Sequence, residues 1–135
     1  FRRYPDMLER RREIVARYDA AFRPLGVQTL DHISDKYTSS YHLYITRVPG
    51  ITYAERGEII EKMAERGIAC NVHFKPLPMH TAYKELGFDI KDYPNAYDFF
   101  ANEITLPLHT CLTDEEVDFV IENYRDVVKS YIGRK

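Results

Sequence analysis

Hydrophobic positions along this chain follow helical spacing in some stretches and strand spacing in others. Residues 2–22 are predicted to form a helix, because their apolar side chains recur on one stripe. The stripe consists of Tyr4, Met7, Leu8, Val15, Tyr18 and Phe22. Residues 41–48 are rich in β-branched and aromatic side chains and are predicted to form a strand, which Pro49 and Gly50 end.

The second helix is predicted from signals at both of its ends. Thr52 and Glu55 have the spacing of a capping box, in which each side chain accepts a hydrogen bond from a backbone amide at the helix start. Gly67 is typical of the left-handed residue that follows a helix. The expected buried stripe between these signals consists of Ile59, Ile60, Met63 and Ala64.

The stretch after this helix, GIACNVHFKPLPMHTAY, is predicted to contain a strand over residues 68–75. Alternation gives it a core face made of Ile68, Cys70, Val72 and Phe74. The opposite face consists of Ala69, Asn71, His73 and Lys75. Pro76 and Pro78 cannot donate to a strand ladder, so the strand should end beside a loop, where ligand contacts are often built. The alternative is a half-solvated strand with a surface histidine.

The last third of the chain is expected to contain two more helices, a strand and a final helix. Residues 79–86 suggest a short helix ended by Gly87, and Pro94 suits the first turn of the next. A short strand follows around Ile104 and Leu106, and Pro107 places it at a sheet edge. The final helix begins at a second capping box and has this stripe: Val117, Val120, Ile121, Tyr124, Val127, Val128 and Tyr131.

These elements predict a single α+β domain over residues 1–135, in which a small sheet of about three strands packs with helices. The composition is 44% hydrophobic and 30% charged, which is typical of a globular protein. The net charge of -2 gives no electrostatic reason to expect a nucleic-acid partner. No apolar run approaches the length of a membrane span. Cys70 and Cys111 lie outside any CxxC and suit a reducing cytosol, so we expect a cytoplasmic protein.

No common catalytic motif identifies a reaction. The sequence contains no GxGxxG, P-loop, HExxH or GxSxG pattern. Its histidines lack metal-ligand spacing, so we expect no metal site. His73 beside Lys75 could serve acid–base chemistry, but these residue types alone do not define a reaction.

Three stretches carry a family resemblance: SSYHLYITRV, GIACNVHFKPLPMHTAYKELGF and EITLPLHTCLTDEEVDFVIE. In this order they resemble the C-terminal domain of the DegT/DnrJ/StrS family, the aminotransferases of nucleotide sugars that depend on pyridoxal 5'-phosphate (PLP). The middle stretch is similar to the family's His-Tyr/Phe-x-Pro-Leu segment, and the last to its Leu-Pro-Leu ending. The resemblance covers nearly the whole chain.

The resemblance implies the small domain of a fold type I aminotransferase, usually a homodimer. In such enzymes the large domain binds PLP and carries the Schiff-base lysine. No lysine here lies in the family's lysine motif, so we expect no catalytic residue and no bound PLP in this chain alone. The helical pattern that begins close to Phe1 fits a piece of a larger protein. The implied reaction moves an amino group from an amino-acid donor, which we expect to be glutamate, to a keto-sugar nucleotide, in amino-sugar biosynthesis for a surface polysaccharide or glycan.

The resemblance also implies where the substrate binds. The family's strand-end histidine and its aromatic neighbour lie near the sugar nucleotide, and these positions are His73 and Phe74 here. Many relatives have tyrosine in place of this phenylalanine, so a hydroxyl is lost. Pro78 stands where many relatives have a second histidine, and His80 is its candidate replacement. The candidate substrate-binding residues are His73, Phe74, Asn71, Lys75 and His80.

The residues alone also allow two other functions. One is a free-standing α+β ligand-binding or regulatory module without catalysis. The other is a nucleic-acid-binding α+β domain, which the acidic balance and the absence of interleaved basic and aromatic residues on one strand disfavour.

Overall fold

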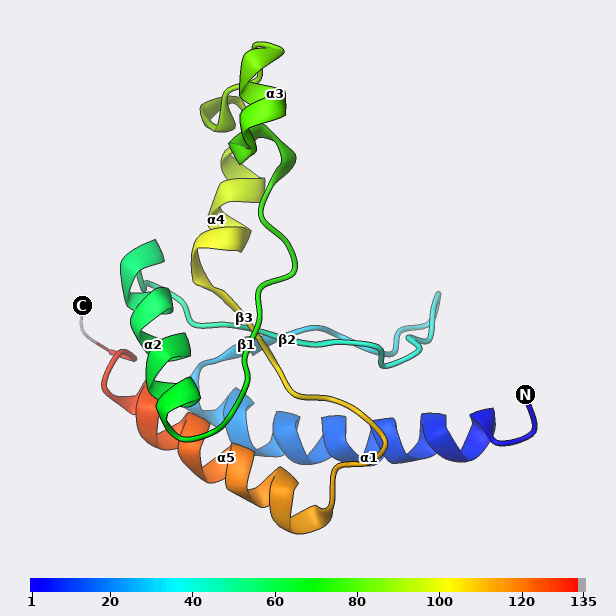
Figure 1. Cartoon of the computed structure of the whole chain (residues 1–135). Helices are drawn as coiled ribbons and strands as arrows, with labels where there is room; N and C mark the ends of the chain where they lie inside the picture. The colour runs from blue at the N-terminus through cyan, green and yellow to red at the C-terminus, as the bar shows by residue number, and fades with distance from the viewer. Residues whose placement is uncertain (134–135) are drawn as a thin grey trace.

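A computed structural model describes residues 1–133 and contains one three-stranded sheet with helices packed against it (Figure 1). The strands are β1 (Gln28–Thr29), β2 (Tyr44–Arg47) and β3 (Glu103–Leu106), in that spatial order. Both neighbouring pairs are antiparallel, and Thr46 of β2 lies opposite Ile104 of β3. The predicted α+β fold with a small sheet is confirmed, and β3 is an edge strand of this sheet, as Pro107 indicated.

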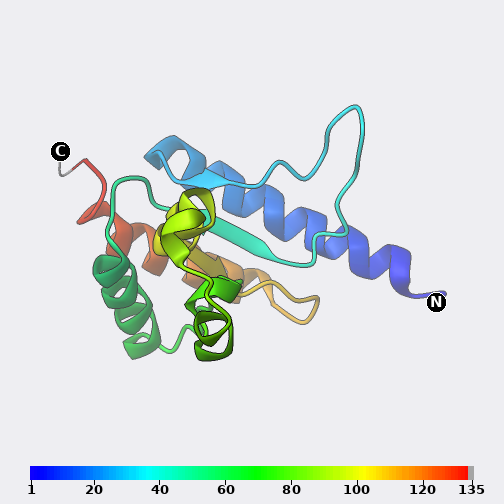
Figure 2. The same cartoon turned by 90° about the horizontal axis from the view of Figure 1, so that it is seen from above.

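Helices α1 (Tyr4–Phe22) and α5 (Asp114–Lys129) lie on one side of the sheet, and the short helices α3 (Thr81–Glu85) and α4 (Pro94–Asn102) lie on the other (Figure 1). Helices α1 and α5 pack side by side, and α2 (Tyr53–Glu65) contacts α5 and β3 (Figures 1 and 2). Helices α3 and α4 belong to a segment that projects away from the sheet. We call residues 72–102 the arm. Short 3₁₀ turns occupy Arg23–Leu25, Leu77–Met79 and Ile90–Asp92.

Four aromatic rings form the centre of the core between the sheet, α1 and α5. Tyr18, Phe22, Tyr44 and Tyr124 are fully buried, and the ring of Phe22 lies 5.0 Å from that of Tyr124. Each of the three tyrosine hydroxyls in this cluster has a hydrogen-bond partner, because an unpaired one would be costly. Tyr18 donates to the Pro107 carbonyl at 3.0 Å and Tyr44 to Asp19 at 2.8 Å. The Tyr124 hydroxyl lies 2.7 Å from Thr46 Oγ1.

The helix ends lie where the local signals placed them. Both capping boxes form, Thr52 with Glu55 at α2 and Thr113 with Glu116 at α5. Gly67 has a φ of 78°, and the amide of the following residue donates to the Met63 carbonyl at 3.0 Å. A left-handed residue after the last turn therefore ends α2, as predicted.

Two predicted stripes are wrong at their ends. Tyr4 and Met7 are exposed, because the first turns of α1 extend past the elements that cover its later turns (Figure 1). Ala64 is also exposed, while α2 buries Ile59 and Met63. In both helices, burial follows the position of the neighbouring element more closely than the apolar pattern does.

The predicted strand over 68–75 is wrong. Only Asn71 pairs with β3, through two backbone hydrogen bonds with Thr105 at 3.0 and 2.8 Å. Extending that antiparallel register puts the next hydrogen-bonded pairs at 69 with 107 and at 73 with 103. Pro107 has no N–H to donate, and the Glu103 side chain takes the amide of His73 instead. The third strand of the sheet is β1, in a stretch where no strand was predicted.

The Thr113 cap allows a stability prediction. Thr113→Ala should lower the free energy of unfolding by about 1 kcal/mol, because the Glu116 amide loses the hydroxyl that it reaches at 3.2 Å. Urea denaturation of the chain measures this change. Thr81→Ala is the matched control, since Thr81 is exposed and its hydroxyl makes no hydrogen bond to residues 1–133. Equal midpoints for the two variants would contradict the prediction.

Candidate functional site

His73 is held by a polar network at the start of β3. Its Nδ1 lies 2.9 Å from Thr105 Oγ1, and its backbone amide donates to Glu103 Oε2 at 2.9 Å. The Thr105 hydroxyl donates in turn to Glu103 Oε1 at 2.5 Å. One carboxylate therefore fixes both the backbone and, through a hydroxyl, the imidazole of His73.

Glu103 is fully buried at the centre of this network. Burial raises the pKa of its carboxyl, because a charge is poorly solvated there. The hydrogen bonds from Thr105 and from the His73 amide lower this pKa again, as does the positive charge of Arg56. The carboxylate thus has donors and a cation around it that compensate part of its burial.

Arg56 lies in α2 with only 5% of its surface exposed. Its guanidinium carbon is 4.6 Å from the centre of the Tyr53 ring and 4.8 Å from that of Phe100, in α4. Such cation–π contacts are worth about 2 kcal/mol when the cation is desolvated. Its Nε has no hydrogen-bond partner among the residues that the structure describes. Arg56 therefore joins α2 to the base of the arm and places a positive charge near Glu103.

The structure divides the candidate residues between two places. The ring of Phe74 lies 4.6 Å from that of His73 in an edge-to-face arrangement, and it is 74% exposed. Its predicted place on a core face is wrong, because no ladder extends to this position. Lys75 and His80 form a separate pair, in which His80 Nε2 lies 3.4 Å from the Lys75 carbonyl oxygen.

The side chain of Asn71 forms a hydrogen bond with the backbone. Its Oδ1 accepts from the amide of Val72 at 2.8 Å, and its own backbone pairs with Thr105. The residue is exposed, but its side chain is engaged in this local turn. Of the five candidates, His73 and Phe74 are therefore the two side chains that the structure presents together.

Sequence reasoning missed Glu103, Thr105 and Arg56. Arg56 lies three and seven residues before Ile59 and Met63, so it continues their buried stripe by one turn. That spacing could have indicated its burial. Glu103 gave no such signal, since its burial depends on a contact with a residue thirty positions away.

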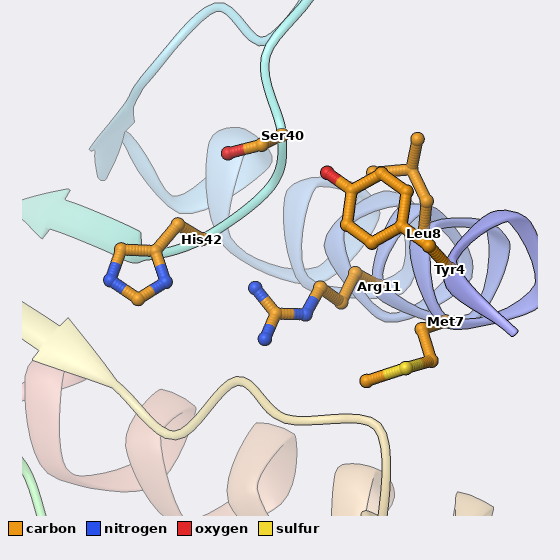
Figure 3. A pocket seen from close by; sticks show the side chains of 6 residues that line it. All are labelled: Tyr4, Met7, Leu8, Arg11, Ser40 and His42. Carbon is orange, nitrogen blue, oxygen red and sulfur yellow. The ribbon is translucent and has the colours of Figure 1, made fainter. Parts of the chain in front are cut away.

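A hollow lies between α1 and the segment before β2. It has a volume of about 220 Å³ and is lined by Tyr4, Met7, Leu8, Arg11, Ser40 and His42 (Figure 3). Arg11 donates to the Tyr41 carbonyl at 3.3 Å, so part of its guanidinium already has a partner. The exposed apolar turns of α1 form one wall of this hollow. It is distinct from the His73 network.

The side chains of residues 1–133 offer neither an enclosed lysine nor a cluster of metal ligands. Every lysine among residues 1–133 is exposed, so none has the enclosed setting in which a lysine holds PLP covalently. Over the same residues, no three His, Cys, Asp or Glu side chains gather in a way that could hold a metal ion. None of the described helices is both long enough and apolar enough to cross a membrane.

Known proteins resemble this chain over nearly its whole length. The sequence profile of the DegT/DnrJ/EryC1/StrS aminotransferase family matches residues 1–125. The spore coat polysaccharide biosynthesis protein SpsC of Bacillus subtilis is 36% identical over 95% of this chain. A UDP-4-amino-4,6-dideoxy-N-acetyl-beta-L-altrosamine transaminase of Helicobacter pylori is 30% identical over 94% of it. The chain spans 34% of the length of each of these two relatives.

A solved structure agrees with this likeness. A Streptococcus pneumoniae protein described as a sugar aminotransferase, in its PLP-form, superposes with a TM-score of 0.92 and 55% sequence identity. The match covers 95% of this chain and 33% of that protein. The fold is therefore that of about one third of a larger enzyme.

Proposed function

We propose that this chain, which belongs to the DegT/DnrJ/EryC1/StrS aminotransferase family, is the C-terminal small domain of a PLP-dependent enzyme. This enzyme transfers an amino group from an amino-acid donor, which we expect to be glutamate, to a keto-sugar nucleotide. The product would serve amino-sugar biosynthesis for a surface polysaccharide or other glycan. The observation that carries the proposal is the imidazole of His73 beside the exposed ring of Phe74, held from within by Glu103 and Thr105.

These two side chains suit a sugar substrate. The Phe74 ring offers an apolar face for the C–H groups of a pyranose, and the imidazole offers a hydrogen bond to a hydroxyl. Asn71, Lys75 and His80 are proposed as further substrate contacts along the same segment. The domain supplies binding and orientation, while PLP supplies the electron sink for transamination.

The remaining parts of the enzyme are proposed to lie outside this chain. A large domain would hold PLP and contribute the lysine that binds it, since the lysines described here are all exposed. We further propose that the complete enzyme is a cytoplasmic homodimer. Its substrate would then bind where the small domain meets the large domain, as pockets often form at domain interfaces.

The function is tested on the complete enzyme. Purified protein is assayed with glutamate and with UDP- or dTDP-linked 4-keto-sugars, because the names of two relatives contain a UDP-linked 4-amino sugar and a dTDP-linked 4-dehydro sugar. Formation of the amino sugar, detected by mass spectrometry, would support the proposal. The absence of amino sugar with every donor and keto-sugar nucleotide tried would refute it.

The chain on its own should neither bind PLP covalently nor transaminate. Mixing residues 1–135 with PLP and borohydride should leave no reduced adduct on any lysine beyond the labelling of a denatured control. The complete enzyme, treated in parallel, should carry one adduct on a large-domain lysine. A stoichiometric adduct on one lysine of the isolated chain, located by peptide mapping, would contradict the assignment.

A further inference from the structure

The His73 ring is bound on one side and free on the other. Nδ1 faces the Thr105 hydroxyl at 2.9 Å, whereas Nε2 makes no hydrogen bond to any residue between 1 and 133. The main-chain amide of His73 is fixed to Glu103 at 2.9 Å. The free nitrogen is therefore held at the surface by groups that lie beneath it.

The direction of the hydrogen bonds follows from the Thr105 hydroxyl, which has a single proton to donate. It lies 2.5 Å from Glu103 Oε1, a length typical of an O–H donor on an ionised carboxylate. A hydroxyl that donates to Glu103 can only accept from His73. In the neutral imidazole, Nδ1 then carries the proton and Nε2 keeps its lone pair.

The ionised form of Glu103 is favoured by groups from three elements. Arg56 in α2 brings a positive charge, Thr105 in β3 donates a hydroxyl proton, and His73 donates its amide. The other titratable neighbours are the His73 imidazole, which lowers the pKa of Glu103 by its charge when protonated, and Tyr124 of α5, which is fully buried. Burial of Glu103 opposes ionisation and is the largest effect, so the pKa of its carboxyl stays above its usual value although the three favourable groups offset part of the burial.

We propose that Glu103 and Thr105 are positioning residues that hold the neutral His73 imidazole as a hydrogen-bond acceptor at Nε2 toward a hydroxyl of the sugar. The proposal rests on the function proposed above. It specifies that His73 recognises a hydroxyl of the substrate and not a phosphate. A lone pair on Nε2 binds an O–H donor, whereas a phosphate oxygen is itself an acceptor and would need an N–H.

The tautomer is measured directly on the complete enzyme. In protein labelled with ¹⁵N-histidine at alkaline pH, where imidazole is neutral, the two ring-nitrogen shifts report which one carries the proton. Loss of a signal in His73→Gln assigns the resonance. The wild-type ring should be protonated at Nδ1. Protonation at Nε2 in the wild-type enzyme would by itself overturn the proposal.

Glu103→Gln should invert the tautomer while preserving the shape of the side chain. The carbonyl oxygen of the introduced glutamine can still accept a hydrogen bond from the His73 amide. The NH₂ of the same side chain then faces the Thr105 hydroxyl. That hydroxyl must then accept from the NH₂ and donate to Nδ1, which moves the ring proton to Nε2. An unchanged tautomer in a folded Glu103→Gln enzyme would overturn the proposal.

Two variants of Thr105 keep the test decisive if Glu103→Gln does not fold. Thr105→Val removes the hydroxyl at nearly constant volume and should give a mixture of tautomers, whereas Thr105→Ser should keep Nδ1 protonated. Ser39→Ala is the matched control. It removes a hydroxyl 3.0 Å from Nδ1 of another histidine, His32, and should leave the His73 signals in place. Identical His73 signals in Thr105→Val and wild type would overturn the proposal.

Kinetics separate positioning from a structural role. Glu103→Gln should raise KM for a UDP-linked 4-keto-sugar about tenfold, the size of one hydrogen bond, with kcat within about twofold. Thr105→Ser should stay near wild type. A lower kcat at unchanged KM would refute the positioning role. An Nδ1-protonated ring in a wild-type enzyme that aminates no keto-sugar nucleotide would refute the proposed function while supporting the network.

Discussion

In the complete enzyme, His73→Ala should raise KM for the keto-sugar nucleotide by about tenfold or more and leave kcat within about threefold. The proposed contact of the imidazole is to a part of the substrate that does not react, so it should bind ground state and transition state alike. If His73 moved a proton in the reaction, kcat would fall by about 10²-fold or more. We expect the binding role, because the lysine that holds PLP already serves proton transfer in this class of enzyme.

Steady-state kinetics over a range of keto-sugar nucleotide concentrations distinguish these results. His73→Asn keeps a polar side chain and should show a smaller rise in KM than His73→Ala. His109→Asn is the control, since His109 is an exposed histidine that lies outside the proposed site. Unchanged kcat and KM in both His73 variants would make His73 a surface histidine without a role in binding.

Phe22→Ala should destabilise the chain by about 3–5 kcal/mol, the largest stability effect that we expect from a single substitution. The Phe22 side chain is fully buried, and its ring lies 5.6 Å from Tyr18 and 5.0 Å from Tyr124. Removing it leaves a cavity where α1, α5 and the sheet meet. Because a domain is stable by only about 5–15 kcal/mol, this loss removes a large share of its stability.

Urea denaturation of residues 1–135 measures the effect of Phe22→Ala. Phe119→Ala is the same substitution at a half-exposed position of α5 and should change stability by no more than about 0.5 kcal/mol. A similar loss in both variants would show that the aromatic cluster is not the centre of the core.

The sequence predicted what depends on neighbours along the chain. Both capping boxes and the Gly67 terminus rely on groups a few residues apart, and all three form as expected. The family stretches also identified His73, which the structure presents beside Phe74. That this histidine binds substrate stays a prediction.

What the sequence did not predict depends on residues that meet only in the fold. The segment 68–75 has the alternation of a strand, but its partners on β3 cannot continue the ladder. Pro107 has no amide proton, and the Glu103 side chain accepts the hydrogen bond from the His73 amide. The polar support of His73 was missed for the same reason. Glu103 and Thr105 lie about thirty residues away, and no spacing in the sequence connects them to it.

The two ends of the arm are joined to each other. The arm leaves the body after Asn71 and returns at Glu103, and the backbone bonds between Asn71 and Thr105, at 3.0 and 2.8 Å, tie these points together. The free energy of closing such a loop changes only slowly with its length. A change in the length of the arm between these joints would therefore cost the domain little closure free energy.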